Sequence, residues 1–435
     1  MKPKGLLIAV VLLAVLSGLV WWSNKKQAAT KPAPDTSTKI LSIPDDQFQD
    51  IRIKTLANLT IDLSRQDNKW TMTQPKPLAA DQDAVSSMVS TLSSLNADKT
   101  VEDKAADLHP YGLDIPTLEV TITKKDGKTA ELLIGNATLD SAGYYAKLAS
   151  DSHVYTIASF AKTNLDKTPE FLRDKRLLTF DPDKLTRVEL QSKGQTVEFG
   201  KNGQNEWQIV KPRPLRADSS QVSGLVDKLR DAKLDNTETA EDAVKKFAGA
   251  EKVATATVTD AAGSQTLEIR KDKDKNYFAK SSVVEGAWKT SAEVGDTLGK
   301  GLDDFRNKKL FDFGFSDPSK VELKNVAYTK TGDKWMSGPK AMDNATVQTL
   351  IDKLRDLSAT KFSEKGGGAP VFEATVTSND GKRVEKVAVS KQGAQYFAKR
   401  DNEPSIYELE AATVEDLQKA AADVKEAAPE PAKKK

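Results

Sequence analysis

The segment NKWTMTQPKPLAADQDAVSSMVSTLSSL, residues 68–95, decides the fold, because two further copies of it follow along the chain. The copies are NEWQIVKPRPLRADSSQVSGLVDKLRDA at residues 205–232 and DKWMSGPKAMDNATVQTLIDKLRDL at residues 333–357. Each copy has a tryptophan, a proline four or five residues later, a polar turn, an aspartate and a helical pattern. The recurrence predicts three related structural units in one chain.

The second half of each copy is predicted to form an amphipathic helix. Asp81, Asp218 and Asp343 stand where an N-cap residue belongs, because a carboxylate accepts hydrogen bonds from the free N–H groups of a first turn. Apolar residues then recur at helical spacing, which predicts one buried stripe and one wet face. They are Val85, Met88, Val89, Leu92 and Leu95; Val222, Leu225, Val226 and Leu229; and Val347, Leu350, Ile351, Leu354 and Leu357.

Alternating apolar and polar residues before the helix predict half-buried strands. In the first copy these strands are residues 51–53, 59–63 and 69–72. Pro75 and Pro77 end this meander, because proline has no N–H group to donate to a sheet.

Two hairpins and a closing helix are predicted after the amphipathic helix. The first hairpin turns at Asp126 and Gly127, a dipeptide typical of two-residue hairpin turns. The predicted segments are strands 118–122, 129–134, 144–147 and 154–157 and a helix from Ala158 to Arg173. Each unit therefore reads three strands, helix, four strands, helix, which is an α+β fold with antiparallel sheet.

The repeat period is about 130 residues, far above the 20–50 residues of solenoid repeats, so each unit is expected to have its own core. The 435-residue chain is also long enough for several domains. The expected divisions are a cytoplasmic n-region and transmembrane signal-anchor at 1–24, a disordered linker at 25–40, repeat units at 41–179, 180–311 and 312–424, and a disordered tail at 425–435.

Residues 5–22 carry no charge and predict a transmembrane helix. At 1.5 Å per residue they would span about 27 Å, enough to cross a bilayer core. A cleaved signal peptide is the alternative, but Trp21 and Trp22 stand where its small residues belong, so the sequence favours a retained anchor. We expect a single-pass protein of the inner (cytoplasmic) membrane, with its short N-terminal tail cytoplasmic and the rest periplasmic.

Composition limits the possible chemistry. The chain has no cysteine, which excludes disulfides, thiol catalysis and Cys-ligated zinc. The net charge is only +2 and basic residues are interspersed with acidic ones, so we expect no nucleic-acid partner. The only histidines, His109 and His153, are interpreted as incidental surface residues. We therefore expect a non-enzymatic protein with no catalytic, metal-binding or cofactor-binding residues.

Two recurring features have competing interpretations. Trp70, Trp207 and Trp335 could line a carbohydrate-binding face, but their position beside an amphipathic helix favours a core role. Residues 366–368 are three glycines without the Lys-Ser/Thr of a phosphate-binding loop, so we interpret them as a loose connection.

Several stretches of the first unit together resemble the bacterial domain of unknown function 4340 (DUF4340). The stretches that carry the resemblance are Trp70 to Asp81, Tyr111 to Pro116 leading into Leu118, Leu132 to Gly135 with Gly143 to Lys147, and Leu172 to Leu178. The resemblance implies a membrane-tethered envelope protein of the kind often encoded beside gliding-motility-type ABC transporters. The later copies depart from it at residues 247–250 and 365–368, where the Tyr-Gly-Leu-Asp run is missing.

These observations lead to one expected function and two alternatives. We expect an accessory or scaffold protein that is held in the lipid bilayer through residues 5–22 and contacts ABC transporter membrane subunits or other envelope proteins. The first alternative is a module that binds cell-wall glycan or peptide through exposed aromatic residues near the second hairpin. A hydrolase is a distant third. Any localised function is expected where the copies differ, such as the loop from Tyr111 to Pro116.

Overall fold

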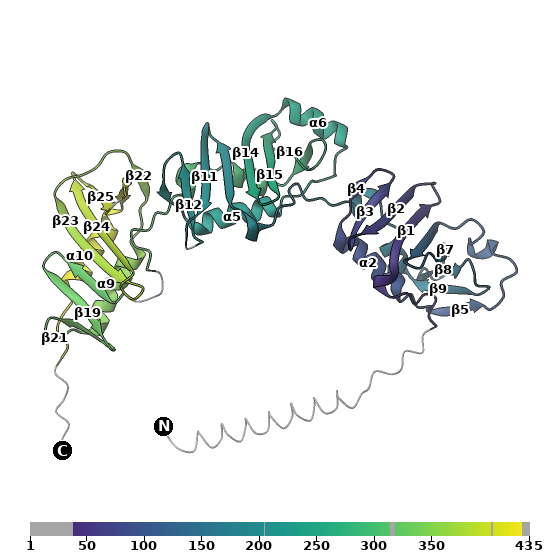
Figure 1. Cartoon of the computed structure of the whole chain (residues 1–435), viewed down its shortest axis with the longest axis horizontal. Coiled ribbons are helices and arrows are strands. Elements are labelled where there is room, and N and C mark those ends of the chain that lie inside the picture. The colour runs from purple at the N-terminus through teal and green to yellow at the C-terminus, as the bar shows by residue number, and fades with distance from the viewer. Residues whose placement is uncertain (1–37, 204, 314–317, 402, 429–435) are drawn as a thin grey trace, which may run out of the picture. The chain divides into compact units, whose positions relative to one another are not determined.

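The computed structural model describes residues 38–203, 205–313, 318–401 and 403–428. The expected transmembrane segment at 5–22 lies outside these ranges, as do most of the linker and of the tail. Within the described residues, no helix is both long and apolar enough to cross a membrane. The chain divides into two compact units, one ending at Asp174 and the other beginning at Lys175 (Figure 1).

The first unit is built on one nine-stranded antiparallel sheet with the order β4-β3-β2-β1-β6-β7-β8-β9-β5. Its strands are β1 (Phe48–Thr55), β2 (Thr60–Gln66), β3 (Lys69–Gln74), β4 (Leu78–Ala79), β5 (Lys99–Glu102), β6 (Leu118–Lys124), β7 (Thr129–Ala137), β8 (Gly143–Leu148) and β9 (Val154–Ala158). Its helices are η1 (Asp45–Gln47), α2 (Gln82–Ser93), η2 (His109–Tyr111), α3 (Ser159–Leu165) and α4 (Pro169–Leu172).

The second unit contains two further sheets of the same design. The first has the order β13-β12-β11-β10-β14-β15-β16-β17 and the second the order β21-β20-β19-β18-β23-β24-β25-β26-β22. The strands of the first are β10 (Arg187–Ser192), β11 (Gln195–Lys201), β12 (Trp207–Lys211), β13 (Leu215–Arg216), β14 (Glu251–Asp260), β15 (Gly263–Lys271), β16 (Tyr277–Ser281) and β17 (Trp288–Thr290). Those of the second are β18 (Lys320–Leu323), β19 (Val326–Thr331), β20 (Lys334–Ser337), β21 (Lys340–Ala341), β22 (Lys361–Ser363), β23 (Pro370–Ser378), β24 (Arg383–Gln392), β25 (Gln395–Arg400) and β26 (Ile406–Leu409).

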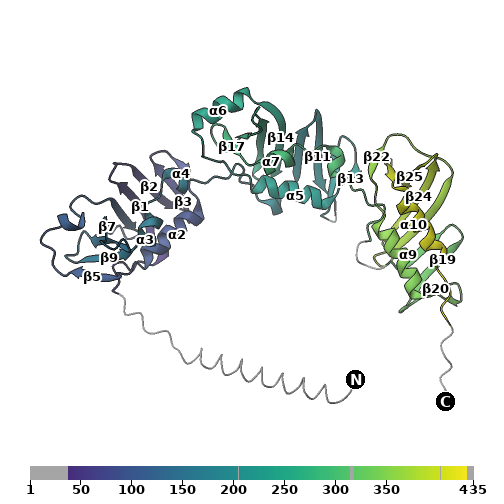
Figure 2. The same ribbon diagram turned by 180° about the vertical axis from the view of Figure 1, so that it is seen from behind.

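The amphipathic helices α5 and α9 of the second unit stand where α2 stands in the first, and further helices close each repeat (Figure 2). They are η3 (Pro182–Lys184), α5 (Ser219–Arg230), α6 (Ala240–Gly249), α7 (Ala292–Leu298), α8 (Leu302–Phe305), α9 (Asn344–Asp356) and α10 (Ala411–Ala422). We call residues 38–174, 175–307 and 308–428 the first, second and third repeat. The expected α+β class, with three repeated units of antiparallel sheet and helix, is therefore confirmed for the described chain.

One face of each sheet and its amphipathic helix enclose a separate core. In the first repeat, Ile51 and Ile53 of β1 are fully buried and share a core with Met88 of α2. Arg52 lies between them on the other face and is exposed, as the strand period of two requires. The cores of the second and third repeats contain the corresponding residues of α5 and α9.

Each predicted N-cap aspartate is confirmed. The Asp81 carboxylate accepts hydrogen bonds from the backbone N–H groups of Asp83 and Ala84, both at 3.1 Å. Asp218 and Asp343 cap α5 and α9 in the same way. Such a cap is worth about 1 kcal/mol to a helix, so the aspartate fixes the residue at which each helix begins.

The structure differs from the predicted unit at three places. The single closing helix from Ala158 to Arg173 is wrong, because α3 ends at Leu165 and α4 begins at Pro169, with the Thr168 side chain as its cap. A proline inside one long helix would clash with the preceding turn, whereas the first turn tolerates it. The short strands β4 and β5 and the second-repeat helix α6 were not predicted.

Helix α6 builds a second small core on the opposite face of its sheet. Tyr277 and Ala279 of β16 belong to the main core, whereas Phe278 between them packs with Phe247 of α6. Ala243 completes this contact from α6. This helix occupies the part of the chain in which the first repeat has the strand β5 and the loop at Tyr111.

The limits of the repeats lie a few residues from the expected ones. The compact units divide between Asp174 and Lys175, where the sequence suggested residues 179 and 180. Thr38 was placed in the linker, but its carbonyl accepts a hydrogen bond from Ala97 N–H. Ala427 was placed in the tail, but its N–H donates to the Ala341 carbonyl.

Val226→Asp is expected to unfold the second repeat. Val226 is 6% exposed in the core face of α5, so the variant buries a carboxylate without a partner and loses roughly 3 kcal/mol or more of unfolding free energy. Ser223→Asp, on the exposed face of the same helix, should change it by no more than about 0.5 kcal/mol. Thermal melting of both variants measures the difference, and a wild-type melting profile for Val226→Asp would contradict the core assignment.

Candidate functional site

The connector between the second and third repeats, residues 305–310, is hydrogen-bonded to the second repeat at its beginning. The backbone N–H of Asp218 donates to the Phe305 carbonyl at 2.8 Å, and that of Asn307 donates to the Arg216 carbonyl at 3.0 Å. The N-cap of α5 therefore also holds the start of the connector. The equivalent bonds join Asp81 to Leu172 and Asp174 to Ala79 in the first repeat, and Asp343 to Lys425 and Ala427 to Ala341 in the third.

The same connector is hydrogen-bonded to the third repeat at its end. Leu310 N–H donates to the Leu357 carbonyl at 2.9 Å, and Ala359 N–H donates to the Lys308 carbonyl at 2.8 Å. The segment from Phe305 to Leu310 is therefore part of both repeats, and no free linker separates them. The equivalent bonds join Ile40 to Leu95 and Ala97 to Thr38 in the first repeat, and Leu177 to Ala232 and Leu234 to Lys175 in the second.

A network of charged side chains surrounds this connector. Arg216 of β13 makes two hydrogen bonds to the Asp312 carboxylate, at 2.8 and 2.7 Å. Its guanidinium also donates to the Tyr407 hydroxyl at 3.2 Å and lies 3.6 Å from the Glu403 carboxylate. One second-repeat arginine thus contacts three side chains of the third repeat.

Arg400 of β25 forms the other half of the network. Its guanidinium pairs with Glu385 at 2.9 Å and with Glu403 at 3.1 Å. The Glu385 carboxylate in turn accepts from the Asp312 backbone N–H at 3.0 Å. Arg383 donates to the Asp312 carbonyl at 2.6 Å and lies 3.7 Å from the carboxylate of Glu206 in the second repeat.

Burial strengthens these interactions. The Glu385 and Glu403 side chains are only 6% and 11% exposed, and Tyr407 is fully buried. Burial, together with the bond to Glu403, raises the pKa of Tyr407, so its hydroxyl stays protonated. Burial alone would lower the pKa of Arg216, but the charges of Asp312 and Glu403 outweigh it and raise that pKa. Every ionised member therefore has an oppositely charged neighbour, as buried charges require.

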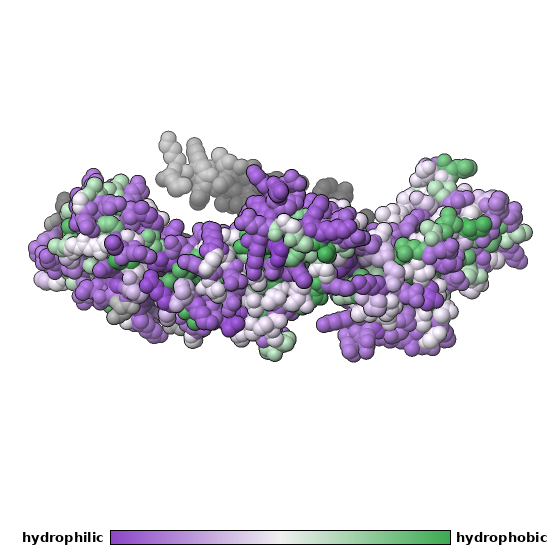
Figure 3. Space-filling model, turned by 90° about the horizontal axis from the view of Figure 1, so that it is seen from above, coloured by the Kyte–Doolittle hydropathy of each residue, from purple (hydrophilic) through white to green (hydrophobic). Residues whose placement is uncertain are grey.

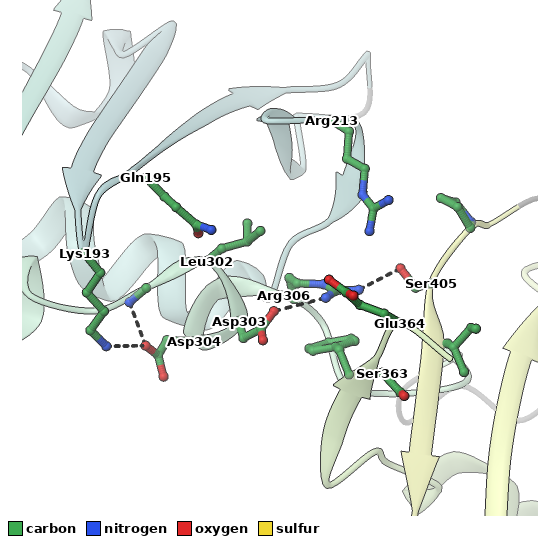
Figure 4. Close-up of a pocket in the computed structure, with 14 residues that line it drawn as sticks. Lys193, Gln195, Arg213, Leu302, Asp303, Asp304, Arg306, Ser363, Glu364 and Ser405 are labelled. Atoms are coloured by element: carbon green, nitrogen blue, oxygen red, sulfur yellow. Dashed lines mark hydrogen bonds and ion pairs between the residues drawn. The ribbon is translucent and has the colours of Figure 1, made fainter. Parts of the chain in front are cut away.

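A polar cleft of about 720 Å³ opens beside the network (Figure 4). On its floor the Arg306 guanidinium stacks on the Phe362 ring, 3.4 Å from the ring centre. Arg306 also donates to the Asp303 carboxylate at 3.0 Å and to the Ser405 hydroxyl at 2.9 Å. Arg306 therefore joins the two repeats at the cleft as Arg216 does at the network.

Two exposed charged residues face this cleft from opposite sides. Arg213 of the second repeat and Glu364 of the third both extend toward it in Figure 4. Lys193 and Asp304 form a looser pair at its edge, 3.8 Å apart. The cleft thus offers both signs of charge to a ligand.

The first-repeat loop that the sequence singled out forms a separate polar group. Tyr111 donates to the Glu102 carboxylate at 2.8 Å and packs edge-on against the Tyr145 ring, with the ring centres 5.0 Å apart. His109 Nδ1 lies 3.0 Å from the Asp114 carboxylate, and this hydrogen bond raises the pKa of His109 and lowers that of Asp114. The His109 side chain is 84% exposed, so its charge is solvated.

The other histidine belongs to a different group. His153 Nδ1 lies 2.6 Å from the Asp151 carboxylate, which also accepts from the Tyr155 hydroxyl at 2.9 Å. The hydrogen bond from His153 lowers the pKa of Asp151 to about 2, so this carboxylate is ionised at neutral pH. Within the described ranges, no three histidine, aspartate or glutamate side chains are grouped in a way that could hold a metal ion.

The tryptophans lie in or against the cores. Trp70 and Trp335 are 4% and 3% exposed, and Trp207 is partly buried under the Lys201 ammonium, 5.1 Å from the ring centre. The Gln82 side-chain amide makes two hydrogen bonds to the Trp70 backbone. It accepts from the Trp70 N–H at 2.8 Å and donates to the Trp70 carbonyl at 2.9 Å. The predicted core role is thus confirmed.

Comparison with known proteins identifies one family. A model described as "Domain of unknown function (DUF4340)" matches residues 70–206 and again residues 207–370. Both segments begin at the tryptophan of the third strand, so each crosses from one structural repeat into the next. No curated protein and no solved structure matches this chain.

The interaction between Arg216 and Asp312 is expected to hold the second and third repeats together. A double-mutant cycle of Arg216→Ala and Asp312→Ala should give a coupling energy of about 1–3 kcal/mol in denaturant unfolding, because the pair is largely desolvated.

The matched control is the first-repeat pair Arg52 and Asp62, which has similar geometry, with bonds of 2.8 and 2.9 Å. The Arg52 side chain is 61% exposed, so the same cycle there should give only about 0.2–1 kcal/mol. Equal coupling energies for the two pairs would show that the network does not join the repeats.

Proposed function

The chain belongs to the DUF4340 family, and for it we propose a non-enzymatic role as a membrane-anchored scaffold. In this proposal the repeats lie on the periplasmic side of the inner membrane and provide contact surfaces for an ABC-type transport system. The chain would act as an accessory component that holds partner subunits in place. Specificity would come from the surfaces in which the repeats differ.

The connector and its charged network support this proposal most directly. Arg216 of the second repeat is paired with Asp312 of the third, and Arg400 pairs with Glu385 and Glu403 beside them. General acid–base or nucleophilic catalysis needs a side chain whose proton or lone pair is free for a substrate. Arg216 and Asp312 instead hydrogen-bond to each other, which suits a structural spacer.

The membrane placement rests on the sequence. Residues 5–22 form an uncharged apolar stretch of bilayer length. The first repeat begins at Thr38, close behind this stretch, so an anchored chain would hold its repeats near the bilayer. The association with a transport system rests on the family resemblance.

A second candidate, binding of a cell-wall peptide or glycan, is favoured by the cleft beside Arg306. Its opposite charges at Arg213 and Glu364 would suit a zwitterionic peptide. The aromatic residues of the second hairpin do not provide a glycan platform in the later repeats, because Phe278 and Tyr396 are buried.

Crosslinking in living cells followed by affinity purification of the full-length chain tests the proposal. We expect membrane subunits of an ABC-type transporter to be recovered. The control is a chain whose residues 1–24 are replaced by a cleavable signal peptide, so that the repeats are exported without an anchor. Recovery of transporter subunits should fall several-fold with this control.

Two results would contradict the scaffold proposal. Recovery of cell-wall fragments alone would favour the peptide or glycan candidate, and that recovery should then depend on Arg213 and Glu364. A C-terminal reporter that is active only in the cytoplasm would place the repeats on the wrong side of the membrane for both candidates.

A further inference from the structure

The first repeat carries three exposed apolar side chains at one end of its sheet, which we call the apolar patch. Val101 lies in β5, Leu139 in the turn between β7 and β8, and Phe160 at the start of α3. Their exposed fractions are 37%, 101% and 68%. Large apolar side chains that are this exposed and this close together often mark a contact surface.

The three side chains share one continuous surface. Val101 and Leu139 line a shallow hollow of about 440 Å³, and Phe160 lines a second hollow of about the same volume. Asp98 borders both hollows. The Ser159 hydroxyl donates to the Ala142 carbonyl at 2.9 Å, which ties the start of α3 to the turn that carries Leu139. Figure 3 shows hydrophobic residues, in green, on the first repeat at the right of the view.

The other repeats have no large apolar side chain at the helix position of Phe160. The buried residues Ala161 and Leu165 of α3 correspond to Val294 and Leu298 of α7, so Phe160 corresponds to Glu293. Glu293 forms an ion pair with Lys228 on the surface of the second repeat. In the third repeat Tyr407 corresponds to Tyr155, and counting on from it places the small residue Ala412 there.

The positions of Leu139 and Val101 also lack a large apolar side chain in the other repeats. The turn of Leu139 corresponds to residues 272–276, Asp-Lys-Asp-Lys-Asn, in the second repeat and to residues 393–394, Gly-Ala, in the third. Thr100 pairs with Tyr155 and Glu102 with Val154, so Val101 is the extra residue of a β-bulge, which β22 of the third repeat lacks. The apolar patch is therefore a property of the first repeat and is not required by the fold.

The chain enters the first repeat beside this patch. The Thr38 carbonyl accepts from Ala97 N–H at 2.8 Å, and Lys39 forms a bridge with Asn96. Asn96 and Ala97 line the same hollow as Phe160. Whatever precedes residue 38 therefore reaches the repeat at the edge of the apolar patch.

The distance from the apolar N-terminal stretch to the patch is limited by chain length. Residues 23–37 separate that stretch from Thr38, and about 15 residues span at most about 50 Å when fully extended. If they behave as a random coil, their average span is only about 20 Å. An anchor at residues 5–22 would thus keep the patch within easy reach of the bilayer surface.

We propose that the apolar patch of the first repeat inserts into the surface of the lipid bilayer. The inference rests on the membrane anchorage in the proposed function. Phenylalanine and leucine side chains partition into the boundary between headgroups and acyl chains, about 5–10 Å below the surface. The bilayer is the surface that the anchor always holds near the point where the chain enters. The second and third repeats have no large apolar side chain at the positions of Leu139 and Phe160, so they stay in water.

Site-directed spin labelling of the full chain in proteoliposomes tests this inference. The chain has no cysteine, so Leu139→Cys and Phe160→Cys each give one labelling site. Both positions are exposed, which means that labelling should not disturb the core. Val384→Cys is the control, because Val384 is an apolar residue of the third repeat with an exposed fraction of 63%.

The vesicles are made of phosphatidylethanolamine and phosphatidylglycerol, and the readout is the collision rate with a water-soluble nickel complex and with oxygen. Labels at 139 and 160 should collide with the nickel complex several-fold less often than the label at 384, and more often with oxygen. Adding Leu139→Glu to Phe160→Cys should return the label at 160 to water.

Failure of this inference is separable from failure of the anchorage. Labels at 139 and 160 that are as accessible to nickel as the label at 384, in protein that stays with the vesicles after an alkaline wash, would overturn the inference and leave the anchorage intact. Loss of the protein from the vesicles in that wash would overturn the anchorage, and the inference with it. Labels that become protected only in native membranes, and not in pure lipid, would overturn the insertion into lipid. They would show that the apolar patch binds a membrane protein.

Discussion

One aspartate in each repeat makes the interaction on which the rest of the structure depends. The Asp218 carboxylate caps α5, and its backbone N–H holds the Phe305 carbonyl at the start of the connector. The beginning of the helix and the end of the repeat are thus fixed by the same residue. Asp81 and Asp343 do the same in the other repeats, and the third repeat fills the place of a connector with its own residues 425–427.

This arrangement ties the second repeat to the third within one compact unit. A connector whose two ends belong to two sheets cannot loosen without breaking hydrogen bonds in both. Arg216 and Arg306 add side-chain contacts on either side of it, to Asp312 and Ser405. Such contacts between buried or half-buried groups add little to the free energy of unfolding, because desolvation offsets much of their attraction. Their main effect is to favour one arrangement of the two repeats over others.

Much of the fold could be predicted because its signals are local. Strand alternation, helical spacing and the cap at Asp218 each lie within a few residues, and the three copies reinforce one another. The connector could not be predicted, because Asp218 and Phe305 are distant in sequence and their bond is between backbone groups that carry no side-chain signal. The break at Pro169 has a signal in the sequence, which is the proline itself, although the residues around it are amphipathic.

The charged network and the apolar patch were missed although a signal was available. Arg216 stands where the other copies have Ala79 and Ala341, two positions before the capping aspartate. Phe160 stands where the second repeat has Glu293. Comparing the copies for differences, as well as for similarities, would have singled out both positions. The pairing of Arg216 with Tyr407 needed the structure, because these residues come from different repeats.

Amide hydrogen exchange of the full chain tests the central claim, which is that the connector belongs to both repeats. The amides of Asn307 and Leu310 donate to carbonyls of the second and third repeats, respectively. The account predicts that they exchange as slowly as amides in the central strands β10 and β18, because all must open together. Exchange at the rate of an unstructured peptide would contradict it and would make the connector an ordinary flexible linker.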